Sequence, residues 1–107
     1  MEKIIINIAK DFSETPGPRY QKDGEFSGEE FREKVLVPKY NEAVEKKVKL
    51  EINLDGGYGY PPSFLEEAFG GLVRKFGKEE VVKTLEFVSL EEPYLLETIQ
   101  KYMEKAI

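Results

Sequence analysis

The sequence has 107 residues, of which 40% are hydrophobic and 12% aromatic, enough for one domain with one core and too few for two. Its 21 acidic and 16 basic residues give a net charge of -5, which repels nucleic-acid phosphates unless basic side chains gather on one face. The absence of cysteine and histidine excludes disulfides, thiolate nucleophiles, cysteine-based zinc sites and the usual general base. We therefore expect a single domain over residues 1–107 that is not an enzyme, uses no metal or cofactor, and binds no nucleic acid.

The N-terminal segment carries a short apolar run, Ile4 to Ile6, before Asn7. This run is far shorter than a signal-peptide core or a membrane span. We expect a soluble cytoplasmic protein that does not associate with membranes. The isoleucine-rich segment from Lys3 to Ala9 predicts a first strand that is buried on at least one face.

A loop rich in proline and glycine follows, over residues 14–27, and a short strand from Arg19 to Lys22 is expected before its Asp-Gly turn signal. Ser27 and Glu30 form an S-x-x-E capping box, which predicts the start of a helix. Pro38 lies in the middle of this helix, so the helix must kink there or divide in two.

The segment VKLEINL, residues 48–54, alternates apolar and polar side chains and is the clearest strand of the chain. After a glycine-rich loop, apolar residues recur at helical spacing over residues 64–76, which predicts a central helix that ends at Gly77. Gly70 and Gly71 each destabilise a helix by about 1 kcal/mol relative to alanine, so we expect them to allow a close approach of this helix to the sheet.

Residues 84–88 predict a last strand, and Ser89 with Glu92, or Pro93 at a first helical position, predicts a final helix. Strands that alternate with helices indicate an α/β domain with a mixed or largely parallel sheet.

The loop DGGYGYPPS, residues 55–63, lies between a strand and a helix N-terminus, where backbone amides favour anions. It matches no phosphate-binding glycine motif, and Pro61 and Pro62 supply no amide donor. Asp55 with Glu66 or Glu67 could form an acid–base pair, although ordinary turn and capping chemistry explains these residues as well. A small-ligand or nucleotide site at this loop stays open as the alternative function.

Tyr58 and Tyr60 are typical either of a recognition surface or of a lid over one end of the core, and the sequence leaves both interpretations open. Ser63 has two interpretations as well. It caps the following helix together with Glu66, or it is a site of phosphorylation whose negative charge a partner would detect.

Three segments, PGPRY, DGEFSGEEFREKVL and SFLEEAFGGLVR, resemble the bacterial STAS-like family of unknown function. That family is related in name and fold to sulfate-transporter and anti-sigma-factor-antagonist domains. The resemblance covers residues 1 to about 90.

The resemblance implies an α/β fold with a mixed sheet of four to five strands and about three helices packed largely on one side. It also implies protein–protein regulation, with a histidine-kinase-like ATPase as the partner. The surface for that partner would comprise the loop and the helix start: Asp55, Gly57, Tyr58, Tyr60, Ser63 and Glu67.

In the antagonist branch, a partner kinase phosphorylates the first serine of a D-S-S-G-like motif in this loop. The resemblance places Pro61 and Pro62 where that branch has an acidic residue and the first serine, and Ser63 where it has the second. Phosphorylation of Ser63 therefore requires a shift of one residue.

Overall fold

Strands β1 (Lys3–Asn7), β2 (Lys49–Asn53) and β3 (Leu85–Val88) form one sheet in that order in the computed structural model, which describes residues 2–106. Both pairings are parallel, with Lys3 opposite Lys49 and Leu50 opposite Leu85. The sheet is therefore smaller than the resemblance implied: within residues 2–106 it has three strands instead of four or five, and it is wholly parallel rather than mixed.

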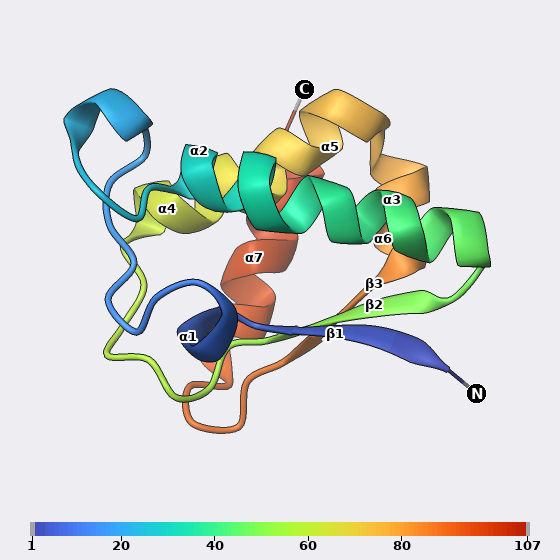
Figure 1. The fold of residues 1–107 in the computed structure, drawn as a ribbon, viewed down its shortest axis with the longest axis horizontal. Helices are drawn as coiled ribbons and strands as arrows, with labels where there is room; N and C mark the ends of the chain where they lie inside the picture. Colours follow the sequence, from blue (N-terminus) through green and yellow to red (C-terminus); the bar gives the residue numbers. More distant parts are fainter. Residues whose placement is uncertain (1, 107) are drawn as a thin grey trace.

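The two faces of the sheet differ sharply in polarity. The helices cover one face of the sheet (Figure 1), and Ile6, Ile52 and Leu85 are buried in the hydrophobic core. The opposite face carries an ion pair between Lys3 Nζ and Glu51 Oε1 at 2.6 Å. The helices thus lie largely on one side of the sheet, and the alternating pattern of β2 arises because only one face is buried.

The first long helix consists of α2 (Gly28–Phe31), a π-helical turn η2 (Arg32–Leu36) and α3 (Val37–Lys46). Ser27 caps it as predicted, since its Oγ accepts a hydrogen bond from the Glu30 N–H at 2.9 Å. The Val37 N–H bonds the Arg32 carbonyl five residues earlier, just before Pro38. The wider π turn accommodates a proline that has no N–H and whose ring crowds the preceding turn. The helix therefore continues through Pro38 and is not divided in two there.

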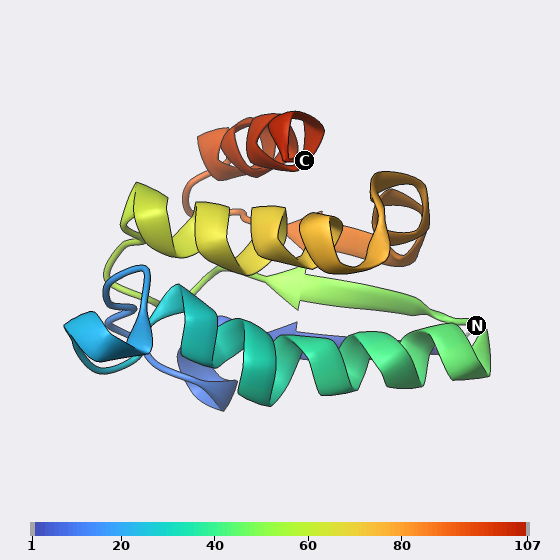
Figure 2. The same cartoon turned by 90° about the horizontal axis from the view of Figure 1, so that it is seen from above.

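The second long helix consists of α4 (Pro62–Leu65), a π-helical turn η3 (Glu66–Gly70) and α5 (Gly71–Phe76), and it ends at Gly77 with a φ of 97°. Figure 2 shows it running beside the first long helix over the sheet, with α7 (Tyr94–Lys105) on the far side. Two further helices were not predicted, α1 (Ile8–Asp11) and α6 (Lys78–Thr84). The expected count of about three helices was therefore too low, since residues 2–106 form five.

The short strand expected at Arg19–Lys22 is wrong, because a 3₁₀ turn η1 (Gln21–Asp23) occupies this segment. The loop folds back on itself and onto the start of α2. The Gly17 N–H bonds the Phe26 carbonyl, and the Gly28 N–H bonds the Pro18 carbonyl. These bonds engage the backbone of the loop locally, so it forms no sheet ladder.

The core lies between the sheet and the two long helices. Aromatic rings form a chain through it, with centroids 5.7 Å apart for Phe31 and Phe64, 6.1 Å for Phe31 and Phe69, and 5.2 Å for Phe69 and Phe87. This chain connects both helices to β3. No helix within residues 2–106 is long and apolar enough to span a lipid bilayer.

Candidate functional site

Asp55 links two loops that leave the carboxyl ends of neighbouring strands. Its Oδ2 accepts a hydrogen bond from the Leu90 N–H at 3.1 Å, and its Oδ1 accepts one from the Glu91 N–H at 2.9 Å. In return, Glu91 Oε1 accepts from the Gly56 N–H at 2.8 Å. Three hydrogen bonds with charged acceptors therefore hold the β2–α4 loop against the β3–α7 loop.

The two linked loops present large exposed side chains. Tyr58 is 84% exposed and Leu90 is 81% exposed. The backbone of the first loop is also held from a third side, because the Tyr58 N–H bonds the Glu14 carbonyl at 2.9 Å. A Cβ at Gly57 would lie 3.3 Å from that carbonyl, so glycine allows the close contact. We call the exposed side chains of Tyr58 and Leu90, with the carboxylates of Glu14, Asp55 and Glu91 around them, the strand-end surface.

Tyr60 is a lid over the core rather than part of the exposed surface. Its hydroxyl donates to the Leu54 carbonyl at 2.8 Å, and its ring lies 6.2 Å from the ring of Phe64. Burial raises the pKa of the Tyr60 hydroxyl, and the nearby carboxylates of Asp55 and Glu92 raise it further. Of the two interpretations that the sequence left open, Tyr58 fits the recognition surface and Tyr60 fits the lid.

The predicted cap at Ser63 is wrong. The helix begins at Pro62, Pro61 stands at the N-cap position, and no side chain caps this end. Proline is well suited to the first helical position because its φ is fixed and its missing N–H has no partner there. Ser63 is thus the second residue of the helix and is half-buried.

Glu66, the proposed partner of that cap, faces two arginines instead. Arg74 Nη1 donates to Glu66 Oε2 at 2.7 Å, and Arg19 Nη1 donates to Glu66 Oε1 at 2.5 Å. Arg74 first, and then Arg19, lower the pKa of the Glu66 carboxyl. Glu66 is therefore held ionised within a cluster of ion pairs.

Glu67, expected at the partner surface, is only 8% exposed and lies between the two long helices. Its Oε2 accepts from Arg32 Nη1 at 2.5 Å, and the same nitrogen donates to the Glu67 carbonyl at 2.9 Å. A Cβ at Gly71 would lie 2.5 Å from this nitrogen. Gly71 therefore makes room for an arginine of the neighbouring helix, whereas the sequence had suggested a close approach to the sheet.

This arginine–glutamate cluster joins the three segments that carry the family resemblance. Arg19 comes from PGPRY, and Arg32 comes from DGEFSGEEFREKVL at the start of the first long helix. The remaining members come from SFLEEAFGGLVR in the second long helix, namely Glu66, Glu67 and Arg74. Sequence analysis did not single out the arginines, because an isolated Arg is ordinarily a solvent-exposed residue. The cluster thus locks the loop 14–27 and both long helices together.

The cavity at the strand-end surface has a volume of about 530 Å³ and is open. Glu14, Asp55 and Glu91 line it, against the single cation Lys10. This negative lining disfavours the phosphates of a nucleotide. Within residues 2–106, no group of three or more acidic side chains is placed to hold a metal ion.

Fold and site together define an α/β domain with a one-sided parallel sheet, whose strand-end loops are rigidly linked and expose apolar side chains. A family model described as a STAS-like domain of unknown function matches residues 27–95. The chain belongs to this family of STAS-like domains. The match includes both long helices and the strand-end loops, and it excludes β1 and most of α7. Neither a curated protein nor a solved structure is detectably similar to the chain.

Proposed function

We propose that this chain is a small cytoplasmic regulatory domain that acts by binding a protein partner through the strand-end surface. The observation that carries the proposal is the presence of Tyr58 and Leu90, each more than four-fifths exposed, on two loops that Asp55 fixes to each other. Tyrosine is enriched at the centre of protein interfaces because it buries a large area and loses little side-chain entropy. Loops that are already ordered also lose less entropy on binding.

The partner that we propose is a histidine-kinase-like ATPase of the anti-sigma type. Support comes from membership in a STAS-like family, since the resemblance of the sequence to antagonist domains implies that class of partner. A non-catalytic role agrees with a sequence that has neither histidine nor cysteine. Ion pairing of Glu66 and Glu67 with arginines removes them from the acid–base chemistry that the sequence left open.

Ser63 remains our candidate for phosphorylation. It lies in the first turn of the second long helix, where the helix dipole favours a phosphate. Because Pro61 occupies the N-cap position, phosphorylation of Ser63 would not remove a cap. The added charge would stand in the helix turn that follows the β2–α4 loop, and we expect it to weaken the binding of a partner to that loop.

Photo-crosslinking in the native cell tests this function. A photoreactive amino acid replaces Tyr58 in one variant and Val44, which is exposed on α3, in a matched control. We expect Tyr58 alone to crosslink to an ATPase with a histidine-kinase-like fold. The double change Tyr58→Ala and Leu90→Ala should then weaken the purified complex at least about tenfold, since central apolar contacts each contribute about 1 kcal/mol or more. Equal crosslinking from both positions, or an unchanged affinity of the double variant, would contradict the proposal.

Mass spectrometry of the native protein under stress tests the modification separately. Phosphate on Ser63, together with weaker partner binding by Ser63→Glu than by Ser63→Ala, is the expected result. If Ser63 never carries phosphate, the proposed modification is wrong, whereas the proposed docking surface is not affected by that result.

A further inference from the structure

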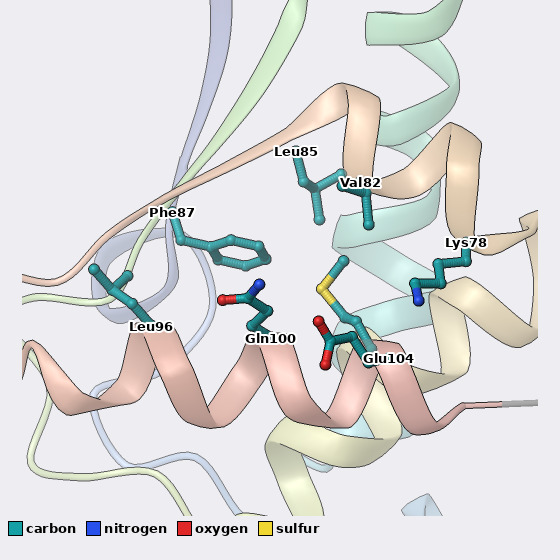
Figure 3. Close-up of a pocket in the computed structure, with 8 residues that line it drawn as sticks. Lys78, Val82, Leu85, Phe87, Leu96, Gln100 and Glu104 are labelled. Atoms are coloured by element: carbon teal, nitrogen blue, oxygen red, sulfur yellow. The ribbon is translucent and has the colours of Figure 1, made fainter.

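A second cavity, of about 340 Å³, lies between α6, β3 and α7 (Figure 3). It shares no lining residue with the strand-end cavity. Most of its lining is apolar and consists of Val82, Leu85, Phe87, Leu96 and Met103. A concave apolar site of this size lies at the small end of the range that binds small molecules.

Three polar side chains complete the lining, Lys78 from α6 and Gln100 and Glu104 from α7. In Figure 3, Leu85 and Phe87 reach into the cavity from the strand, and the polar ends of Gln100, Glu104 and Lys78 lie along the side next to α7. No ion pair within residues 2–106 joins Lys78 to Glu104 or engages either of them elsewhere. A cation and an anion therefore stand at one side of an apolar cavity.

We propose that this cavity binds a free α-amino acid with a large apolar side chain, such as leucine or phenylalanine. The ligand carboxylate would lie at Lys78, its ammonium at Glu104, and its side chain against Phe87 and Leu85. This pairing gives each of the two charges an opposite charge on the ligand. A fatty acid has a carboxylate but no cation, so it would place a negative charge near Glu104 and leave Glu104 without a partner.

The volume fits the same class of ligand. A cavity of about 340 Å³ is at the lower end of the range for small-molecule sites, so it suits a ligand as small as a single amino acid. Since the polar side chains stand at the rim in contact with water, each charge contributes modestly, and we expect a dissociation constant on the order of 1 mM.

The proposal of a ligand in this cavity does not rest on the proposed docking function. Leu96, Gln100, Met103 and Glu104 all lie beyond residue 95, where the family match ends. The cavity is therefore built in part from the segment of this chain that the family model does not cover.

Titration of the isotope-labelled protein, followed by two-dimensional NMR, tests the proposal directly. The probes are L-leucine and L-phenylalanine, with glycine, N-acetyl-L-leucine and L-leucine amide as probes that each lack one recognised group. We expect saturable shifts of the Val82, Phe87 and Gln100 amides with the first two probes. The other three should bind about two- to fivefold more weakly or not at all.

Two variants test whether Lys78 binds the ligand carboxylate and whether Glu104 binds the ligand ammonium. With Lys78→Met, leucine and leucine amide should bind equally, and with Glu104→Gln, leucine and N-acetyl-leucine should bind equally. Lys101→Met and Glu97→Gln are matched controls, because this exposed pair lies on α7, the helix that carries Glu104, and outside the cavity lining. Absence of saturation at tens of millimolar, equal binding of all five probes, or shifts that lie elsewhere would each overturn the proposal.

Discussion

The guanidinium of Arg32 and the carboxylate of Glu67 form an ion pair between the two long helices, 35 positions apart in the sequence. Both side chains are almost fully shielded, at 13% and 10% exposure. Because each charge is buried with the other, loss of one partner leaves an uncompensated charge in a poorly hydrated site.

Glu67→Gln should therefore lower the free energy of unfolding by about 3 kcal/mol, as measured by urea denaturation. The double change Arg32→Met and Glu67→Met removes both charges and should recover at least half of that loss. Glu33→Gln is the control, because Glu33 is exposed and lies 3.9 Å from the same guanidinium. An equal loss in the control would show that the pair does not stabilise the helix contact. No recovery in the double variant would show that an uncompensated charge is not the source of the loss.

Gly28, one turn before Arg32, also brings the two long helices together. A Cβ at this position would lie 2.6 Å from the Phe64 carbonyl oxygen, a backbone atom that cannot rotate away. We expect Gly28→Ala to destabilise the domain by about 1 to 3 kcal/mol, although alanine normally favours a helix. Thermal unfolding measures this, with Asn41→Ala at an exposed position of α3 as the reference. A Gly28→Ala variant as stable as the reference would mean that the helices can separate without cost.

Asp55 should control the order of the strand-end surface. Asp55→Ala leaves the N–H groups of Leu90 and Glu91 without their carboxylate acceptor, so amide hydrogen exchange in residues 89–92 should accelerate by roughly tenfold. Glu86→Ala, which changes an exposed carboxylate on β3, is the matched control and should leave this exchange unchanged. Unaltered exchange in Asp55→Ala would show that the loops are held by other contacts.

Tyr60 should give the domain a specific sensitivity to alkaline pH. Its pKa in the folded protein is raised above the ordinary value of 10.0 by burial and neighbouring carboxylates. A raised folded-state pKa means that the hydroxyl contributes stability fully below pH 10, and that this contribution declines as the pH rises above that value.

Tyr60→Phe should lose about 1 kcal/mol at neutral pH, because the Leu54 carbonyl loses its donor, and its stability should then fall less steeply above pH 10. Urea unfolding at neutral and alkaline pH measures both effects. Tyr58→Phe is the control, since that side chain is almost fully exposed. Equal slopes for both variants above pH 10 would exclude Tyr60 as the source.

Local patterns predicted the strands and the long helices well. The S-x-x-E capping box, however, marks a true helix cap at one site and not at others. S-x-x-E occurs at Ser27, Ser63 and Ser89, and only Ser27 is a cap. At the last site Pro93 stands at the N-cap position of α7, so Ser89 does not cap this helix and Pro93 is not its first residue. At the second site Pro61 and Pro62 fit the N-cap and first helical positions, so the helix starts two residues earlier than a cap at Ser63 would place it. Proline geometry thus overrides a capping box, which the sequence could have indicated.

Other features depend on contacts that no local pattern contains. Helix α6 was missed because Val81 and Val82 are β-branched and adjoin the predicted strand. Leu90 was missed as a surface residue because its segment was read only as a helix start. Pairing of Arg32 with Glu67 has no signal in either segment alone.

The parallel register of the sheet also has a consequence for the rate of folding. Lys3 pairs with Lys49 and Leu50 with Leu85, so each ladder closes only after tens of intervening residues have been brought into place. The sheet within residues 2–106 therefore contains no hairpin that could form early and act as a nucleus. The two long helices, which are local structures, would have to supply the first ordered surface, and the strands would assemble upon it.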